Sequence, residues 1–150
     1  MNIEKKNARN SATLEDAISI AALAHKGQKE KANASYILHP LRIMLRMKTE
    51  AEMIAGVLHD VVEDSEWTLE QLREQGFSEE ILKAVECLTH KEGEDYENYI
   101  ERVKANDIAR KVKLADLEDN MNIRRISSDL TERDLKRLEK YHKVWRVLNY

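Results

Sequence analysis

EMIAGVLHDVVED, residues 52–64, is the segment that decides how this chain folds. Its apolar residues recur at the three- and four-residue spacing of a helix that packs against a core. Thr49 lies just before the segment and Glu52 follows three residues later, which is the pattern of a capping box. We therefore predict a helix that begins at Thr49 and ends in the acidic cluster HDVVED, residues 59–64.

Polar groups crowd the end of this predicted helix. A charged Asp60 next to apolar positions is unfavourable unless a cation or a donor compensates it. Residues four apart share a helix face, so Glu63 should lie beside His59 and Asp64 beside Asp60. Three carboxylates so close repel one another unless a divalent ion supplies positive charge. A His-Asp pair alone is a weak motif that also fits a solvated helix end, but the clustering indicates a cation nearby.

Helical spacing extends over most of the chain. Only one Pro and four Gly occur in 150 residues, which is fewer turn-forming residues than the many short turns of a sandwich or a barrel need. Start signals or apolar stripes predict further helices from Thr13, near Pro40, from Thr68 to Gly76, from Ser78, through Tyr99, from about Asp107 and through Trp145. We predict an all-α fold in which residues 1–150 form one compact domain.

Composition excludes several classes of protein. The formal net charge is -3, so the clustered basic excess of a nucleic-acid-binding protein is missing and no nucleic-acid partner is expected. Cys87 is the single cysteine and cannot form an internal disulfide. The N-terminal segment has no signal-peptide core and no apolar run reaches membrane-spanning length. We expect a cytoplasmic protein without a membrane partner, and nothing indicates its oligomeric state.

Four segments carry a family resemblance. They are AHKGQ at 24–28, YILHP at 36–40, GVLHDVVEDS at 56–65 and KLADLEDNM at 113–121. In this order and spacing they resemble the HD hydrolase domain of SpoT/RelA-type alarmone enzymes, especially the stand-alone small alarmone hydrolases. The resemblance covers most of the chain and implies an HD-type helical fold.

The resemblance also implies a metal site and a reaction. One divalent ion, usually Mn²⁺ in this family, would be held by His39, His59, Asp60 and Asp116. Glu63 and Asp64 would position or deprotonate the attacking water. Nitrogen and oxygen donors of this kind suit Mn²⁺, Fe²⁺, Co²⁺ or Zn²⁺, and the donor type alone does not choose among them. Such an ion activates water and polarises a phosphoryl oxygen, which is phosphoester hydrolysis chemistry.

The family's substrate is a nucleotide, guanosine tetra- or pentaphosphate, which loses its 3′-pyrophosphate. Full-length relatives add a synthetase domain, for which this chain has no room, so we expect hydrolysis alone. Residues that would contact the nucleotide or its phosphates are Lys31, Tyr36, Lys113, Asn120 and Tyr141. Among these, Lys31 fits a solvated loop residue equally well, and Tyr141 a packing residue.

Some positions depart from the family pattern. Glu30 stands where relatives usually carry an Arg that stacks on guanine, and we expect Glu30 to face the base and change base preference. Leu117 and Asp119 replace residues that are often basic, or His or Tyr, in relatives. His25 should be a hydrogen-bonded core histidine, whereas His90 should face solvent.

Two alternatives stay open. One is an HD-type phosphohydrolase of another nucleotide or phosphoester, which a substrate panel would distinguish. The other is a non-catalytic nucleotide-binding module, against which Glu63 and Asp64 argue, because binding alone needs no two carboxylates beside a metal. Metal analysis combined with an activity assay would decide between a module and an enzyme.

Overall fold

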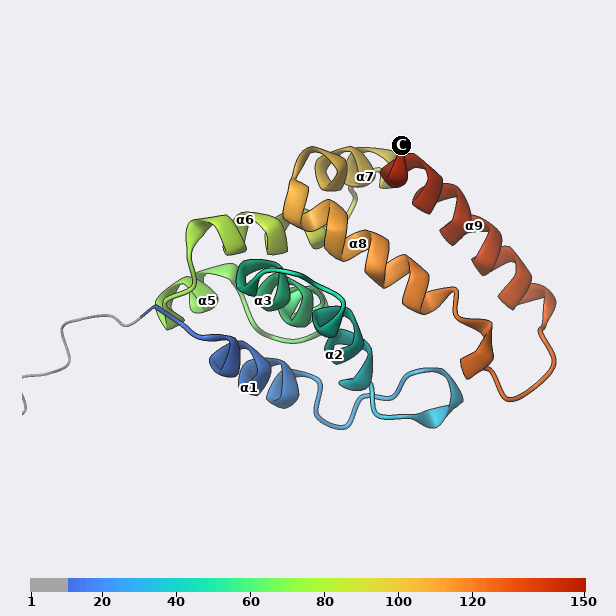
Figure 1. Ribbon diagram of the computed structural model, residues 1–150, viewed down its shortest axis with the longest axis horizontal. Helices are drawn as coiled ribbons and strands as arrows, with labels where there is room; N and C mark the ends of the chain where they lie inside the picture. Colours follow the sequence, from blue (N-terminus) through green and yellow to red (C-terminus); the bar gives the residue numbers. More distant parts are fainter. Residues whose placement is uncertain (1–10) are drawn as a thin grey trace, which may run out of the picture.

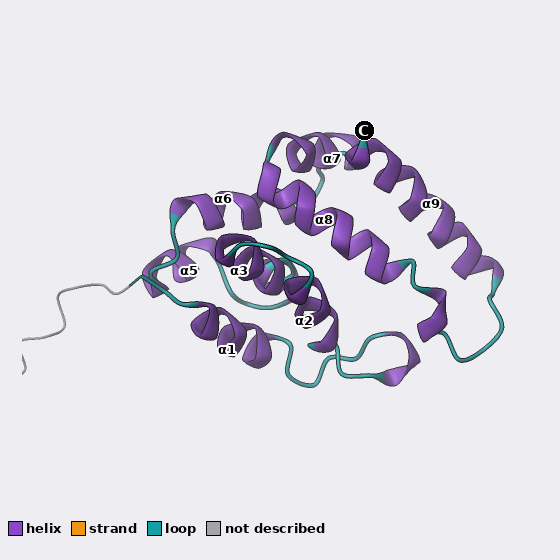
Figure 2. Ribbon diagram, in the orientation of Figure 1, coloured by secondary structure: helices purple, strands orange, loops and turns teal. Residues whose placement is uncertain are grey.

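The computed structural model describes residues 11–150, and these residues form an all-helical structure (Figure 1). The helices are α1 Leu14–Ala24, α2 Leu38–Leu45, α3 Glu50–Leu58, α4 Val61–Asp64, α5 Leu69–Gln75, α6 Glu79–Leu88, α7 Tyr96–Ala105, α8 Asp107–Asn120 and α9 Glu132–Asn149, with short 3₁₀ turns at Lys31–Asn33 and Ile123–Arg125. Between residues 11 and 150 no strand forms, as Figure 2 shows, and Lys29 and Ser35 make one isolated bridge. The all-α prediction is confirmed.

Residues 1–10 lie outside the described part, and with them most of the segment in which we expected no signal peptide. That the whole range 1–150 forms one domain therefore stays a prediction. None of the helices between residues 11 and 150 combines the length and the apolar character that crossing a bilayer requires.

Several helices begin at the capping residues that the sequence predicts. Capping boxes join Thr13 to Asp16, Thr49 to Glu52 and Thr68 to Gln71. Ser78 caps α6 by accepting a hydrogen bond from the N–H of Ile81. Each such cap is worth about 1 kcal/mol, because it satisfies backbone donors that have no partner inside the helix. Gly76 ends α5 in the left-handed conformation, with φ 101°, which costs glycine little.

The end of α3 differs from the prediction. We expected one helix through HDVVED, but α3 ends at Leu58 and the one-turn helix α4 begins at Val61. Adjacent residues of a continuous helix point about 100° apart. The turn between α3 and α4 instead brings the side chains of His59 and Asp60 together, with Nε2 and Oδ2 3.0 Å apart.

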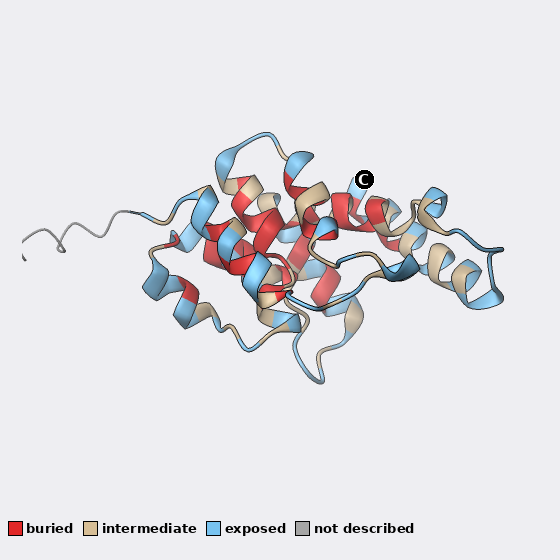
Figure 3. Ribbon diagram, turned by 90° about the horizontal axis from the view of Figure 1, so that it is seen from below, coloured by how far each residue is buried: buried red, intermediate tan, exposed pale blue. Residues whose placement is uncertain are grey.

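Helix α3 lies at the centre of the fold and contacts α1, α2, α6 and α8. Its residues from Ile54 to Leu58 are all buried, in the region where buried residues concentrate in Figure 3. Gly56 lies against α2, and a Cβ added there would be in van der Waals contact with Ile43 Cγ2 at 3.4 Å. Helix α8 also packs against α2 and α3, so a helix from a distant part of the sequence meets this consecutive pair beside the α3–α4 turn.

Candidate metal centre

Two histidines and two aspartates meet where α2, α8 and the α3–α4 turn converge. His39 Nε2 lies 3.0 Å from Asp116 Oδ1 and 4.0 Å from Asp60 Oδ2. His59 Nε2 lies 3.0 Å from Asp60 Oδ2 and 3.7 Å from Asp116 Oδ1. Donors about 2.1 Å from one ion and at right angles to each other are about 3 Å apart. The spacing therefore suits a single transition-metal ion.

The chemistry of the donors fits a metal. The whole residues His39, His59 and Asp116 are 3%, 2% and 6% exposed. The ring of His59 bonds the Gly56 carbonyl through Nδ1 at 2.7 Å, which leaves a lone pair on Nε2. Among residues 11–150 this buried Nε2 has no hydrogen-bond partner. A buried lone pair facing carboxylates is unfavourable unless a proton or a cation lies between them.

Asp60 connects the predicted ligands to the predicted catalytic carboxylates. Oxygen atoms of Asp60, Glu63 and Asp64 lie within 4.8 Å of one another, so the expected convergence of three carboxylates is present. A separate group with the same spacing contains His39, His59 and Asp116. Glu63 and Asp64 are exposed, which puts them on the side from which water reaches the site.

The carboxylate cluster changes the pKa of Asp64. Partial burial and the charges of Asp60 and Glu63 raise this pKa to about 6. A base whose pKa lies near the working pH is both available and effective for proton transfer. The electrostatics therefore agree with a water-activating role for Asp64.

Protons hold the donor set together when no ion is bound. Burial lowers the pKa of His39 and of His59, but the neighbouring carboxylates outweigh it and raise both pKa values. Burial raises the pKa of Asp116, yet Lys113 and the two imidazoles lower it well below its usual range. The carboxylates thus favour the protonated form of both imidazoles, and a bound metal ion would have to replace those protons.

Three of the predicted substrate-binding residues contact predicted metal ligands. Lys113 Nζ lies 2.7 Å from Asp116 Oδ2, and Asn120 Nδ2 donates to Asp116 Oδ1 at 2.9 Å. The hydroxyl of Tyr36 donates to Asp60 Oδ2. These contacts orient the carboxylates of Asp60 and Asp116, and Lys113 also carries positive charge to the site.

The other two predicted substrate-binding residues, Lys31 and Tyr141, lie away from the His/Asp cluster. Lys31 is exposed and lines a cavity of about 270 Å³ with Ile126, Ser127 and Asp134. Tyr141 is half-buried and packs against an apolar cluster to which α2, α3 and α6 to α9 all contribute. The structure places neither of them among the converging donors.

Glu30, which we expect to face a nucleotide base, is bonded to two arginines of the chain. Its carboxylate accepts hydrogen bonds from Arg42 at 2.8 Å and from Arg125 at 2.8 Å, and the side chain is 9% exposed. Burial raises its pKa, but the two guanidinium groups outweigh this and lower it. The charge of the carboxylate is therefore balanced by the two guanidinium groups inside the protein.

Two other residues at the site were missed from the sequence. Asp119 bonds the predicted metal ligand His39, with Nδ1 and Oδ2 2.6 Å apart. Its position one turn after Asp116, on the same face of α8, was the available signal. His90, which we expected to face solvent, is half-buried, and its backbone N–H donates to Glu63 Oε1 at 2.8 Å. His25 is buried and bonds Gln28, as predicted.

Together, the helical fold and the His/Asp cluster at the α3–α4 turn define a helical domain with a candidate site for one metal ion. The HD domain family matches residues 17–127 of this chain. The chain belongs to the HD domain family, and the predicted HD-type fold is confirmed.

Named relatives come from nucleotide metabolism. A guanosine-3′,5′-bis(diphosphate) 3′-pyrophosphohydrolase of Aquifex aeolicus is 31% identical over 118 residues, which are 73% of this chain and 17% of that protein. A GTP pyrophosphokinase of Streptomyces coelicolor is 38% identical over 80 residues, 51% of this chain and 9% of that protein. The chain thus spans less than a fifth of the length of these relatives.

A solved structure shares the fold. It is that of a metazoan ortholog of SpoT, described as hydrolysing ppGpp, with a TM-score of 0.75 and 22% identity. The match covers 93% of this chain and 86% of that chain. The described helices are therefore arranged as in a known protein of nearly the same extent.

Proposed function

We propose that this chain is a metal-dependent pyrophosphohydrolase that removes the 3′-pyrophosphate from guanosine 3′,5′-bis(diphosphate) or a related alarmone. The observation that carries the proposal is the cluster of His39, His59, Asp60 and Asp116, with the carboxylates of Glu63 and Asp64 beside it. The names of the relatives suggest the nucleotide. They include both a hydrolase and a pyrophosphokinase, and the water-activating carboxylates favour hydrolysis.

A divalent ion, Mn²⁺ as the first choice, would be held by these four residues and would supply positive charge to water and to a phosphoryl oxygen. The donor set alone does not distinguish Mn²⁺ from Fe²⁺, Co²⁺ or Zn²⁺.

Asp64 and Glu63 have different roles in the proposed reaction. Asp64, with its pKa raised to about 6, accepts a proton from the attacking water. Glu63 is fixed by the N–H of His90 and orients that water. The water oxygen bonds to the phosphorus next to the ribose as the bond from phosphorus to the 3′-oxygen breaks. The 3′-oxygen takes up the proton that Asp64 accepted and leaves as a hydroxyl, so the products are GDP or GTP and pyrophosphate.

Charge around the site suits a polyphosphate. Lys113 Nζ lies beside Asp116 and is largely enclosed, with its side chain 16% exposed. Burial lowers the pKa of Lys113, but Asp116 and the ring of Tyr99 outweigh burial and raise it, so the ammonium stays charged. An ammonium held next to the donors can neutralise phosphate oxygens. A nucleotide substrate of this kind is also consistent with the cytoplasmic location that we propose.

A different base is the second candidate, favoured by the arginine contacts of Glu30. This residue cannot stack on a purine, and its carboxylate is already bonded to Arg42 and Arg125. Adenosine 3′-pyrophosphates therefore belong in the test beside the guanosine compounds.

The deciding experiment incubates Mn²⁺-loaded protein with guanosine and adenosine 3′-pyrophosphates and with GTP, and separates the products by chromatography. We expect pyrophosphate and a free 3′-hydroxyl from at least one 3′-pyrophosphate, and no change in GTP. The Asp64→Asn variant serves as the inactive control. Absence of pyrophosphate from every 3′-pyrophosphorylated nucleotide, in protein with bound metal, would contradict the proposed reaction.

A further inference from the structure

The imidazole of His39 is held from both sides. Its Nε2 faces the donor cluster, 3.0 Å from Asp116 Oδ1, while its Nδ1 lies 2.6 Å from Asp119 Oδ2. A carboxylate on the second nitrogen of a metal-binding histidine keeps the proton on that nitrogen and leaves the lone pair on the other. The carboxylate also fixes the orientation of the ring and makes it a stronger donor.

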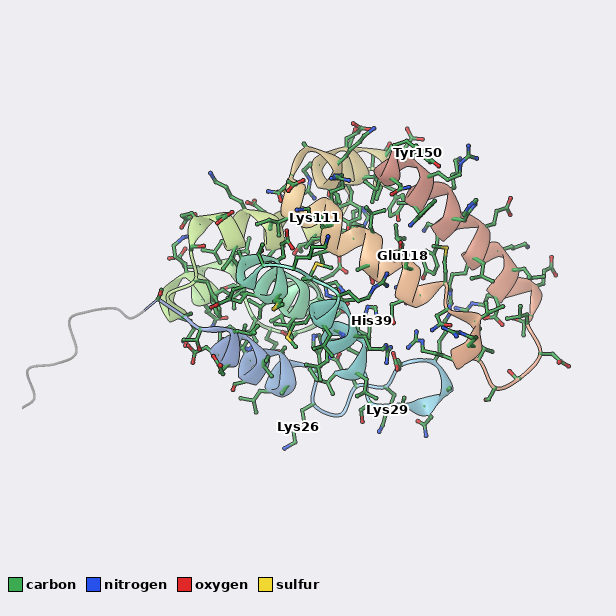
Figure 4. All side chains as sticks on the ribbon, viewed as in Figure 1. Lys26, Lys29, His39, Lys111, Glu118 and Tyr150 are labelled. Carbon is green, nitrogen blue, oxygen red and sulfur yellow. The ribbon has the colours of Figure 1, made fainter. Side chains whose placement is uncertain are left out.

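Asp119 is itself clamped by a charged side chain. The whole residue is 7% exposed, and Arg42 binds both its oxygens, with Nε 2.8 Å from Oδ1 and Nη2 3.0 Å from Oδ2. Such a bidentate pair defines the position of the carboxylate in two directions. Arg42 follows His39 by three residues on α2, so one helix face carries the ligand and the clamp. Figure 4 labels His39 on α2, the helix that packs against α8 with Asp119.

Glu30 and Arg125 form a second charged pair, and Glu30 holds Arg42 in place. Glu30 accepts from Arg42 Nη2 at 2.8 Å and from Arg125 Nη1 at 2.8 Å. Arg125 Nη2 also donates to the backbone carbonyl of Asp119 at 3.1 Å. The two carboxylates are thus balanced by two guanidinium groups. Because the charges cancel, Asp119 can bond a neutral imidazole without remaining an uncompensated buried charge.

This group could be mistaken for a second metal site, because donor atoms of Glu30, His39 and Asp119 lie within 4.8 Å of one another. The guanidinium groups already occupy the carboxylate oxygens, and Nδ1 of His39 is bonded to Asp119. The positive charge that these carboxylates need is supplied by arginine.

We propose that Asp119 is a positioning residue that makes His39 a metal ligand, and that Arg42, braced by Glu30 and Arg125, holds Asp119 in place. The inference rests on the proposed metal centre. It gives the departures at Glu30 and Asp119 a shared role, since both belong to the same charge network behind the site.

The test is a titration of metal-free protein with Mn²⁺, followed by calorimetry and by the electron paramagnetic resonance signal of free Mn²⁺. Asp119→Asn keeps the size of the side chain but removes its charge. Loss of such a carboxylate typically weakens metal binding about 10- to 100-fold, and we expect a Kd increased within that range. Glu118→Gln makes the matching change on the neighbouring residue, whose carboxylate is bonded to Arg46 and Trp145, and should leave Kd within about twofold of wild type.

Asp119→Asn also leaves Arg42 with one charged partner fewer, so lost stability has to be separated from lost positioning. Glu30→Gln disrupts the outer part of the same network but keeps the bond between His39 and Asp119. We expect Glu30→Gln to lower the thermal midpoint of the metal-free protein while its Mn²⁺ Kd rises less than about threefold. Arg42→Lys, which keeps the charge but loses the bidentate grip, should give a Kd between those of wild type and Asp119→Asn.

The outcomes separate the two proposals. Wild-type protein that binds no divalent metal would overturn the metal centre itself. Wild-type protein that binds Mn²⁺, together with folded Asp119→Asn of unchanged Kd, would overturn only the role of Asp119. Equal weakening in Asp119→Asn and Glu30→Gln, in step with their loss of thermal midpoint, would also overturn it, because it would show a general structural effect.

Discussion

The carboxylate of Glu63 on α4 accepts a hydrogen bond from the backbone N–H of His90, at 2.8 Å, across 27 residues of sequence. The turn that presents this N–H is held by Arg102, which donates to the carbonyls of Glu86 and Thr89 and to the carboxylate of Glu94. A candidate catalytic carboxylate is thus oriented by a hydrogen-bonded turn, and Asp64 beside it is exposed and belongs to the same carboxylate cluster.

The first prediction is that Glu63→Gln and Asp64→Asn keep the fold and the metal but lose most turnover. Both changes keep side-chain size, and Gln can still accept the hydrogen bond from His90. Positioned acid-base groups are typically worth about 10²- to 10⁴-fold, so kcat should fall within that range. Steady-state kinetics and elemental analysis on the same samples check this. Turnover within about threefold of wild type in both variants would remove the water-activating role.

The second prediction concerns the ligands. His59→Ala and Asp116→Ala should each bind far less metal, because each removes a donor and leaves buried groups without compensation. Elemental analysis after dialysis should give about one divalent ion per wild-type chain and much less in the variants. As a control, His142→Ala changes an exposed histidine on α9 and should keep the wild-type content. Full metal content in both ligand variants would rule the assignment out.

Metal affinity should rise with pH. In the metal-free protein the pKa values of His39 and His59 are raised by the surrounding carboxylates, so both rings hold protons above the pH at which free histidine loses them. Stability from these charged rings is fully present below about pH 6.5 and is lost as the pH rises through the folded-state pKa values. Because an ion must displace these protons, Kd should fall up to about tenfold per pH unit for each proton released. Calorimetry in buffers of different ionisation enthalpy measures that number, and a Kd that is constant from pH 6 to 8 contradicts the expectation.

Low pH should destabilise the metal-free protein. Burial raises the pKa of Asp119, but His39, Arg42 and Arg125 outweigh it and lower this pKa far below its usual range. A lowered pKa contributes stability above the unfolded value of about 3.9 and loses it as the pH falls towards the folded-state value. Urea unfolding between pH 6 and 2 should therefore show that the free energy of unfolding declines with falling pH, and that it declines less in Asp119→Asn than in wild type. An equal decline in both proteins would show that other carboxylates cause the loss of stability at low pH.

Glu30→Arg should not restore base recognition. The change would put a third guanidinium against Arg42 and Arg125, which now share the Glu30 carboxylate. Loss of these hydrogen bonds to charged groups should reduce the free energy of unfolding by about 1–3 kcal/mol, with the larger values tempered by the partial exposure of Arg42. Urea titration measures the loss, and kinetics on the guanosine substrate measure KM. A stable variant with a lower KM would mean that residue 30 can reach the nucleotide.

Local signals in the sequence predicted the helices, the HD-type family and a set of candidate donors. Thr13, Thr49 and Thr68 cap their helices because a hydroxyl and a partner three residues later satisfy backbone donors locally. His59, Asp60 and Asp116 stood out because polar groups in apolar helical segments need compensation.

Only the tertiary structure decided which partners those groups have. The bond between His39 and Asp119 joins residues 80 positions apart, and no local pattern specifies it. The carboxylate of Glu30 would be exposed if the loop stood alone. In the folded chain its charge is balanced by Arg42 and Arg125, because α2 and the turn after α8 fold beside it. Hydrogen bonds and charges act over a few ångströms in space, so packing, and not sequence separation, brings Glu30 and Asp119 together beside the candidate metal centre.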